Sequence, residues 1–174
     1  MPHIRLMTPE DAPVLTQLLQ TNRDFIAPFD PIRSDSYFTL EGQQAVITTA
    51  LENHAAGRQG PYVVLNDDGA VIGRITLNDI VRGALQSATI GYWIDAAHNG
   101  RGLASAAVAE LISIAFDELK LHRLEAGTLL DNVRSQRVLE RNGFERFGIA
   151  PKLLKIQGQW QDHVLYQLLT PHEV

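Results

Sequence analysis

The sequence contains no cysteine. Disulfide bonds, catalysis through a cysteine thiolate and metal sites built on thiolates are therefore excluded. The six histidines supply no substitute, because none lies in a His-Glu-x-x-His arrangement. A Gly-x-Ser-x-Gly motif is also absent, so the sequence gives no support to a serine hydrolase. We expect no metal ion in this protein.

Long apolar stretches are missing as well. No run approaches the roughly 18 residues that would span a bilayer. The first residues, MPHIRLMTPED, do not combine a basic leader with a long apolar segment. We therefore expect neither a membrane anchor nor a secretory signal, and we predict a cytoplasmic protein.

Basic residues are few and scattered. The chain has 15 Lys and Arg against 20 Asp and Glu, which gives a formal net charge of −5. A nucleic-acid-binding protein usually presents a clustered basic face. The charge balance therefore argues against nucleic acid as a partner. It favours a cationic acceptor only weakly, because a modest negative charge also serves solubility.

The 174 residues are enough for one compact core and contain no repeat or linker, so we expect a single domain over residues 1–174.

Residues 22–38 show no period, and their aromatic side chains fit either an acceptor pocket or the core. Apolar periodicity and turn residues predict strands near 3–7, 62–65, 71–77, 88–94, 122–129, 144–156 and 160–169, and helices near 9–19, 40–56, 103–119 and 132–142. A helical crossover would make the strand at 122–129 parallel to its predecessor, whereas the earlier strands form an antiparallel meander.

The run ATIGYWIDAAHNGRGLASAAVAEL, residues 88–111, changes from a strand pattern to an alanine-rich helical pattern at a glycine turn. A helix N-terminus presents unpaired N–H groups and partial positive charge, which favour a phosphate if the backbone can approach it. Gly100 and Gly102 permit that approach, and Arg101 adds a cation. Ala104 and Ser105 keep the first turn narrow. The glycine spacing alone also fits an ordinary turn into a core helix, because short glycine motifs recur by chance.

Two motifs change that balance. Asn99-Gly100-Arg101-Gly102-Leu103-Ala104 resembles the Gln/Arg-x-x-Gly-x-Gly/Ala pattern of the GNAT acetyltransferase superfamily. Asn132-Val133-Arg134-Ser135, followed by Asn142-Gly143-Phe144, resembles that superfamily's Asn-x-x-Ala/Ser helix ending in Gly-Phe. Asn22-Arg23 and the late Trp160-Gln161-Asp162-His163 are similar to the RimJ/RimL-type branch. The resemblance covers nearly the whole chain and implies a mixed α/β GNAT fold, a largely antiparallel sheet with a central, splayed parallel strand pair, flanked by helices.

The resemblance also implies acetyl-CoA as cosubstrate. In the family, the pyrophosphate lies on the glycine turn and the pantetheine lies beside the preceding strand, where backbone amides polarise the thioester carbonyl. The residues implied to bind acetyl-CoA are Tyr92, Trp93, Ile94, Asn99, Gly100, Arg101, Gly102, Leu103, Ala104, Ser105, Asn132 and Ser135.

Many family members protonate the leaving thiolate with a tyrosine, but Leu139 occupies that position here. The RimJ/RimL pattern implies Ser135 instead, and one helical turn places it on the same face as Asn132. Asn132 could equally be only an N-cap, and Ser135 could face solvent. For the base, Asp162 and His163 are candidates, of which at most one lines the site because strand neighbours point to opposite faces. We predict Asp162, with a structural role for either residue left open.

These features predict direct transfer of acetyl to an amine, because the chain has no cysteine and no recognisable activated serine for an acyl-enzyme. The RimJ/RimL resemblance implies a protein N-terminal α-amino group. An α-amino group is about one-seventh neutral at neutral pH, whereas a lysine is neutral in only about one part in 2,500. A small-molecule amine such as an antibiotic, polyamine or amino acid is one alternative, and a non-catalytic CoA-binding module is another. The pattern leaves a two-fold homodimer open.

Overall fold

A computed structural model describes residues 3–171. The strands are β1 (Ile4–Leu6), β2 (Gly60–Leu65), β3 (Val71–Val81), β4 (Ser87–Ile94), β5 (Arg123–Leu129), β6 (Glu145–Ile156) and β7 (Gln159–Leu169). The α-helices are α1 (Ala12–Thr21), α2 (Arg23–Ile26), α3 (Leu40–Ala55), α4 (Leu103–Ser113) and α5 (Val133–Arg141). Single turns of 3₁₀ helix are η1 (Pro9–Asp11), η2 (Ala27–Phe29), η3 (Asp35–Phe38) and η4 (Ala96–His98), and η5 (Ile114–Glu118) is a π-helical turn.

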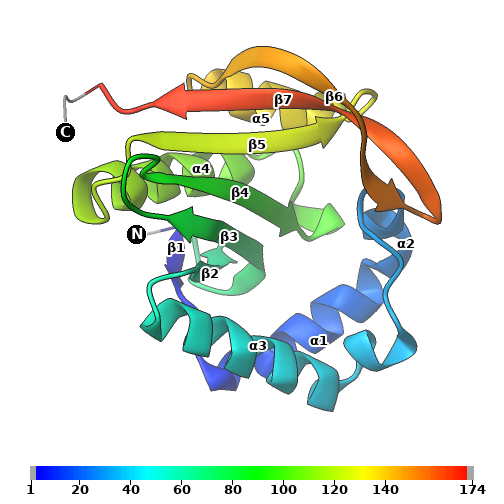
Figure 1. Ribbon diagram of the computed structural model, residues 1–174. Helices are drawn as coiled ribbons and strands as arrows, with labels where there is room; N and C mark the ends of the chain where they lie inside the picture. The colour runs from blue at the N-terminus through cyan, green and yellow to red at the C-terminus, as the bar shows by residue number, and fades with distance from the viewer. Residues whose placement is uncertain (1–2, 172–174) are drawn as a thin grey trace.

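The strands form one seven-stranded sheet in the order β1-β2-β3-β4-β5-β7-β6 (Figure 1). Every neighbouring pair is antiparallel except β4 and β5, which are parallel and are joined through α4. The expected mixed sheet with one central parallel pair is therefore confirmed. No helix within residues 3–171 has both the length and the apolar content needed to cross a membrane.

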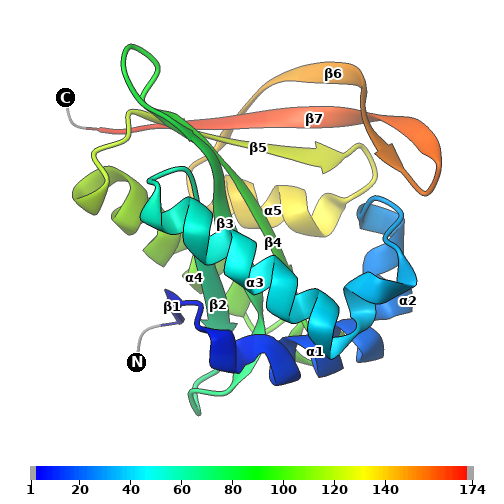
Figure 2. The same ribbon diagram turned by 60° about the horizontal axis from the view of Figure 1, so that its bottom comes forward.

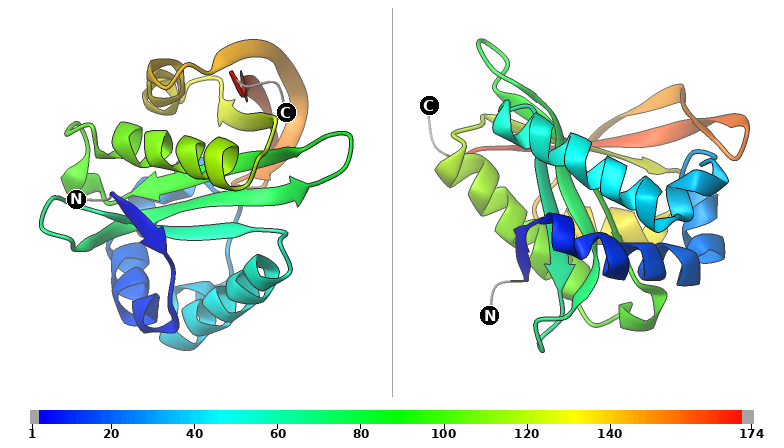
Figure 3. Two further views of the ribbon diagram at one scale, coloured as in Figure 1. Left: turned by 90° about the vertical axis from the view of Figure 1, so that its left-hand side faces the viewer. Right: turned by 90° about the horizontal axis from the view of Figure 1, so that it is seen from below.

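Helices cover both faces of the sheet. Figures 2 and 3 show α1 and α3 on one face, with α4 and α5 on the other. On the α4 face, Ile75, Leu77 and Ile90 join a large apolar cluster with the buried side of α4. On the α1 face, Met7 and Leu15 join Ile47 and Val63 in a smaller one. The alternation of side chains along each strand produces the two clusters.

Local chemistry explains the element boundaries. The Thr39 side chain accepts a hydrogen bond from Gly42 N at 3.1 Å and starts α3, and Gly57, at φ +70°, ends it. In the β2–β3 turn, the Asn66 side chain accepts hydrogen bonds from Asp68 N and Ala70 N. Such an Asx turn stabilises the connection between the two strands locally.

Two expectations need correction. The helix predicted over 103–119 changes character after Ser113, where a π-helical turn keeps Ala115 and Phe116 buried. Residues 22–38 are not irregular throughout, because they contain α2, η2 and η3. None of the aromatic residues of that segment is fully buried, which argues against the core alternative for them.

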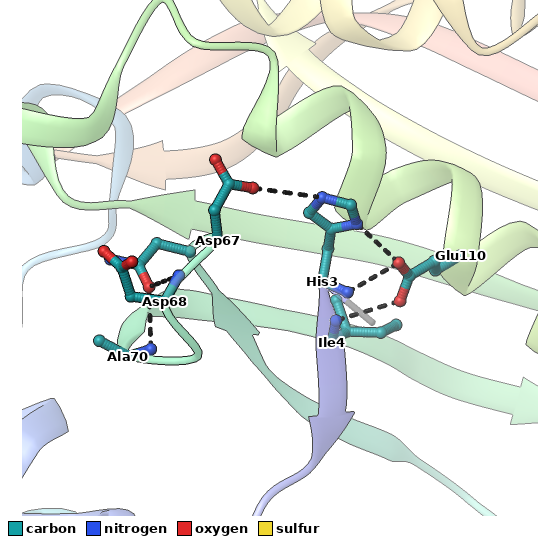
Figure 4. A network of polar contacts seen from close by, with 7 residues as sticks. His3, Ile4, Asp67, Asp68, Ala70 and Glu110 are labelled. Carbon is teal, nitrogen blue, oxygen red and sulfur yellow. Dashed lines mark hydrogen bonds and ion pairs between the residues drawn. The ribbon is translucent and has the colours of Figure 1, made fainter. Parts of the chain in front are cut away.

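The N-terminal strand is tied to α4 by one carboxylate (Figure 4). Glu110 accepts hydrogen bonds from His3 N at 2.7 Å and Ile4 N at 3.1 Å, and its Oε1 also lies 2.8 Å from His3 Nδ1. Burial alone would raise the pKa of Glu110, but these hydrogen bonds outweigh burial and lower it. The contact holds α4 in place against the sheet, and α4 carries the glycine turn at its other end.

Candidate active site

The glycine turn has the backbone shape that an anion site at a helix start requires. Gly102 is the N-cap of α4 at φ +80°, and Gly100 lies at φ +78°. Both are in the left-handed region that favours glycine. No side chain caps the helix, and a Cβ added at either glycine would meet no heavy atom within 4 Å. The first N–H groups of an α-helix have no intrahelical partner, and the two glycines before α4 add no side chain that could cover them.

The side chains around this turn leave the backbone accessible. Asn99 and Arg101 are exposed, whereas Leu103 is buried and anchors the first turn of α4 in the core. The Ser105 side chain already has a partner within the protein, because its Oγ accepts a hydrogen bond from Asn142 Nδ2 at 3.0 Å. This bond joins the start of α4 to the end of α5.

Beside the turn, the central parallel strands separate. Pairing of β4 with β5 extends from Ser87–Arg123 to Thr89–Glu125 and goes no further. Beyond that point β4 stays paired with β3 as far as Ile94, while β5 stays paired with β7 as far as Leu129. The gap therefore opens beside residues 90–94, where the strand leaves backbone groups on its β5 side for another partner.

One side chain from β4 reaches α5 at this gap. Tyr92 Oη lies 2.8 Å from Ser135 Oγ and 3.3 Å from the Ser135 carbonyl oxygen. Burial raises the pKa of Tyr92 to about 12, although its hydrogen bond with Ser135 acts in the opposite direction. The phenol therefore keeps its proton across the neutral range. Tyr92 and Ser135, which the sequence assigned separately to acetyl-CoA binding, form one hydrogen-bonded pair.

Asn132 acts as the N-cap of α5. Its side-chain oxygen accepts a hydrogen bond from Ser135 N at 3.2 Å, which satisfies one N–H of the first turn. The same contact fixes the position of Ser135 relative to the gap. Leu139 occupies the position where many family members have a tyrosine. It is fully buried in the core, so this position holds an apolar side chain and offers no proton donor.

Asp162 and His163 lie on β7, toward the edge of the sheet. The Asp162 side chain accepts a hydrogen bond from Lys152 N at 2.8 Å, at the irregularity where the β6–β7 register shifts. His163 is buried, and its Nδ1 lies 3.0 Å from the Gln161 carbonyl oxygen. Neither makes a hydrogen bond with Ser135 or Tyr92 in the described chain. The assignment of Asp162 as a base stays a prediction. Its hydrogen bond with Lys152 N also gives it a structural role, because it stabilises the irregular part of β6.

The sequence did not reveal how the end of β4 is held. Asn22, buried at the end of α1, donates from Nδ2 to Asp95 Oδ1 at 2.9 Å and accepts from Ala96 N at 2.8 Å. Burial acts to raise the pKa of Asp95, but hydrogen bonds from Asn22 and His98 prevail and lower it. The resemblance of Asn22-Arg23 to the RimJ/RimL-type branch drew attention to Asn22. No local sequence pattern predicts that Asp95 is its hydrogen-bond partner.

A cavity of about 380 Å³ lies on the α3 side of the sheet. Arg74 and Thr76 of β3 contribute to its lining, with Thr49 of α3 and Gln59. Within residues 3–171, Arg74 makes no ion pair. In that same range, no three His, Cys, Asp or Glu side chains group as metal ligands.

Comparison with known proteins identifies the family. A family profile described as an acetyltransferase (GNAT) domain matches residues 3–145. The chain belongs to the GNAT family of acetyltransferases, and it is an N-acetyltransferase, as the motifs predicted.

Two curated relatives cover nearly all of the chain. It is 42% identical over 172 residues to the Probable N-acetyltransferase YjcK of Bacillus subtilis, a match that spans 98% of this chain and 95% of that protein. It is 34% identical over 169 residues to the [ribosomal protein uS5]-alanine N-acetyltransferase of Escherichia coli, which spans 97% and 87%.

Solved structures agree with the fold. The ribosomal-protein-S5-alanine acetyltransferase of Vibrio fischeri superposes with a TM-score of 0.93 at 30% identity and covers 98% of this chain and 95% of that one. Mycobacterium smegmatis RimJ, solved in complex with a CoA-disulfide, superposes with a TM-score of 0.92 at 28% identity and covers 95% and 80%. The RimJ/RimL-type resemblance is thus confirmed at the level of fold and family.

Proposed function

We propose that this enzyme transfers acetyl from acetyl-CoA directly to the N-terminal α-amino group of a protein. The proposal depends on one observation. The start of α4, where Gly102 has a left-handed backbone conformation and no side chain caps the helix, lies near the point where β4 separates from β5. The pyrophosphate would accept hydrogen bonds from the first turn of α4. The pantetheine would continue along residues 92–94 and end near Ser135.

The reaction needs few groups from the protein. A neutral amine attacks the thioester carbonyl, the C–S bond breaks with its electron pair on sulfur, and one proton passes overall from the amine to the thiol. Backbone N–H groups beside the gap would stabilise the developing oxyanion, and the Ser135 hydroxyl would donate to the leaving sulfur. An α-amino acceptor is already partly neutral at neutral pH, so a water or a moderate base such as Asp162 could receive its proton.

Two relatives support a protein acceptor, since the Escherichia coli and Vibrio fischeri enzymes are both named for the alanine of a ribosomal protein. The test is to measure CoA release with two matched sets of acceptors: short peptides with free or blocked N-termini, and small amines. We expect turnover of free-N-terminal peptides and none of blocked peptides that retain a lysine. Efficient turnover of small amines with unmodified peptides would refute the protein acceptor.

One observation favours a second acceptor class. Arg74 lines the 380 Å³ cavity without an ion-pair partner in the described chain, and β3 is the strand next to β4. An acceptor that carries a carboxylate or phosphate would pair with this guanidinium. A small amine with such a group is therefore the alternative to a protein N-terminus.

Arg74→Met distinguishes the two acceptors. For an anionic small amine, the variant should raise KM by roughly tenfold or more, because a charge-assisted hydrogen bond is lost. For a neutral peptide N-terminus, it should leave KM nearly unchanged. Arg82→Met is the matched control, because Arg82 is an exposed arginine beyond the end of β3.

A further inference from the structure

The contact between Tyr92 and Ser135 allows two hydrogen-bond arrangements. In one, the phenol donates to Ser135 Oγ across 2.8 Å. In the other, the serine hydroxyl donates to the phenol oxygen, while the phenol donates to the Ser135 carbonyl across 3.3 Å. Only the first leaves the serine proton available to a third group.

Geometry and acidity favour the first arrangement. The distance of 2.8 Å is ordinary for an O–H···O bond, whereas 3.3 Å is long for one. A phenol is a much stronger acid than an aliphatic alcohol and is therefore the better donor of the two. Serine in a helix often donates back to a carbonyl of the preceding turn, but within residues 3–171 the Ser135 hydroxyl makes no such bond.

We propose that Tyr92 is a positioning residue for the proposed acetyl transfer: its phenol donates to Ser135 Oγ, so that the serine proton is directed into the gap between β4 and β5, toward the sulfur of CoA. This inference rests on the proposed function of the site. Tyr92 transfers no proton in this scheme. It fixes the direction of the hydrogen bond that Ser135 gives to the departing thiolate.

The acidity of the groups is consistent with that role. The pKa of Tyr92, raised by burial to about 12, lies far above that of an ordinary thiol at about 8.5. Complete proton transfer from Tyr92 to the sulfur would therefore be unfavourable. A phenol that stays protonated remains a permanent donor to Ser135.

The test is the pKa of the thiol of CoA bound to the full-length enzyme, followed by the ultraviolet absorbance of the thiolate as pH is raised. It requires no acceptor, so it does not depend on whether peptides are substrates. A serine proton aimed at the sulfur should lower the bound thiol pKa relative to free CoA. Tyr92→Phe and Ser135→Ala should each raise it again by about half a unit to one unit, the range of one hydrogen bond. The double variant should raise it no further.

A matched control removes another phenol that touches α5. Tyr166 Oη donates to Glu140 Oε1 at 3.1 Å from β7, and Tyr166 is buried. Tyr166→Phe should change stability without changing the bound thiol pKa. Ser135→Thr keeps a hydroxyl and should retain most of the shift that Ser135→Ala loses.

Replacing Tyr92 with 3-fluorotyrosine tests the direction of the bond with little change in packing. The fluorinated phenol is more acidic and donates more strongly, so the bound thiol pKa should fall further. If Ser135 instead donates to Tyr92, the serine proton points away from the sulfur in both proteins, so that pKa should stay unchanged. This substitution also decides the question if Tyr92→Phe does not fold.

Turnover gives a second measurement. Tyr92→Phe should lower kcat by about three- to tenfold with little change in KM for acetyl-CoA, and it should have no additional effect in the Ser135→Ala background. Additive losses, or a bound thiol whose pKa equals that of free CoA in the wild type, would overturn the proposal. Absence of peptide turnover with the thiol shifts intact would refute only the acceptor assignment.

Discussion

The face of the sheet beneath α4 and α5 is filled by one large apolar cluster, whereas the face beneath α1 and α3 combines a smaller cluster with a cavity and several buried polar side chains. The first face carries the glycine turn and the Tyr92–Ser135 pair. The second carries Asn22, Gln43 and Asp11 among its buried groups. Apolar packing dominates the face beneath α4 and α5 and gives it a fixed geometry, to which a few hydrogen bonds such as that of Ser105 with Asn142 are added. The other face depends more on directional hydrogen bonds, which single substitutions can remove one at a time.

Asn22 connects the two faces. It lies at the end of α1, and its side chain makes hydrogen bonds with the residues that follow β4, just before the glycine turn. Asn22→Ala should have the largest effect on stability, lowering the free energy of unfolding by about 3 kcal/mol. The substitution removes the buried side chain that accepts from Ala96 N and donates to Asp95 Oδ1, so Ala96 N loses its partner and the Asp95 carboxylate is left with its contacts with His98 and Ala97. Denaturant unfolding measures the loss.

Asn66→Ala is the matched control for that prediction. Asn66 also holds two backbone N–H groups, but it does so in an exposed turn where water can replace it. Its loss should cost about 1 kcal/mol. Equal losses for the two variants would show that burial of the Asn22 network contributes nothing.

On the face beneath α4 and α5, Gly102→Val should weaken acetyl-CoA binding by tenfold or more, about 1.4 kcal/mol. A β-branched residue is strained at φ +80°, and its side chain would occupy the space through which a phosphate approaches α4. Calorimetric titration with CoA measures the effect. Gly57→Val is the control, because Gly57 has a similar φ of +70° and open surroundings but ends α3 instead. It should lose comparable stability and keep CoA affinity. Unchanged affinity in Gly102→Val would place the pyrophosphate elsewhere.

The same contrast explains what the sequence could predict. The antiparallel meander, the parallel pair and the glycine turn follow from short-range signals: alternation along 88–94, glycine at positions of positive φ, and an alanine-rich helix. Alternation along this strand places Tyr92 on the same side as Ile90 and Ile94, and in the structure all three pack in or against the larger apolar cluster. Each of these signals depends only on neighbouring residues, so a single sequence contains them in full.

Long-range polar partners could not be predicted in this way. The Tyr92–Ser135 contact joins residues 43 positions apart, and the Asn22–Asp95 contact joins residues 73 apart. Hydrogen bonds between distant residues leave no period in the sequence. The short helices within 22–38 were also missed, because each is too short to show an apolar stripe.

Acid should weaken a buried ion pair on the face beneath α1 and α3. Asp11 is buried and pairs with Arg5 through two hydrogen bonds, at 2.7 and 2.8 Å. Burial alone would raise the pKa of Asp11, but the bonds from Arg5 and Thr8 prevail and hold it below the ordinary 3.8. A depressed carboxyl pKa stabilises the folded state above the unfolded-state value, and this stabilisation is lost as pH falls through the folded-state value.

Asp11→Asn should therefore lower the free energy of unfolding by about 1–2 kcal/mol at neutral pH, and the difference from wild type should shrink as pH falls below about 4. Denaturant titrations at neutral pH and at about pH 3 measure it. Asp68→Asn, in an exposed turn, should match wild type at both. A difference that stays constant with pH would mean that the charge of Asp11 is not what stabilises the contact.

The smallest expected effect lies where the β6–β7 turn meets residues 27–30. Gln157 Nε2 donates to the Ala27 carbonyl oxygen at 2.7 Å, and Gln157 lines a cavity of about 130 Å³ together with Tyr37 and Phe38. Gln157→Ala removes one exposed hydrogen bond, so it should raise the acceptor KM by only about two- to threefold and leave acetyl-CoA affinity unchanged. Gln159→Ala, in the same turn, should change neither quantity. The hydrogen bonds of Gln157 go to carbonyl oxygens of Ala27 and Asp30, before α3. An altered CoA affinity would therefore mean that the two faces of the sheet are coupled more widely than through Asn22.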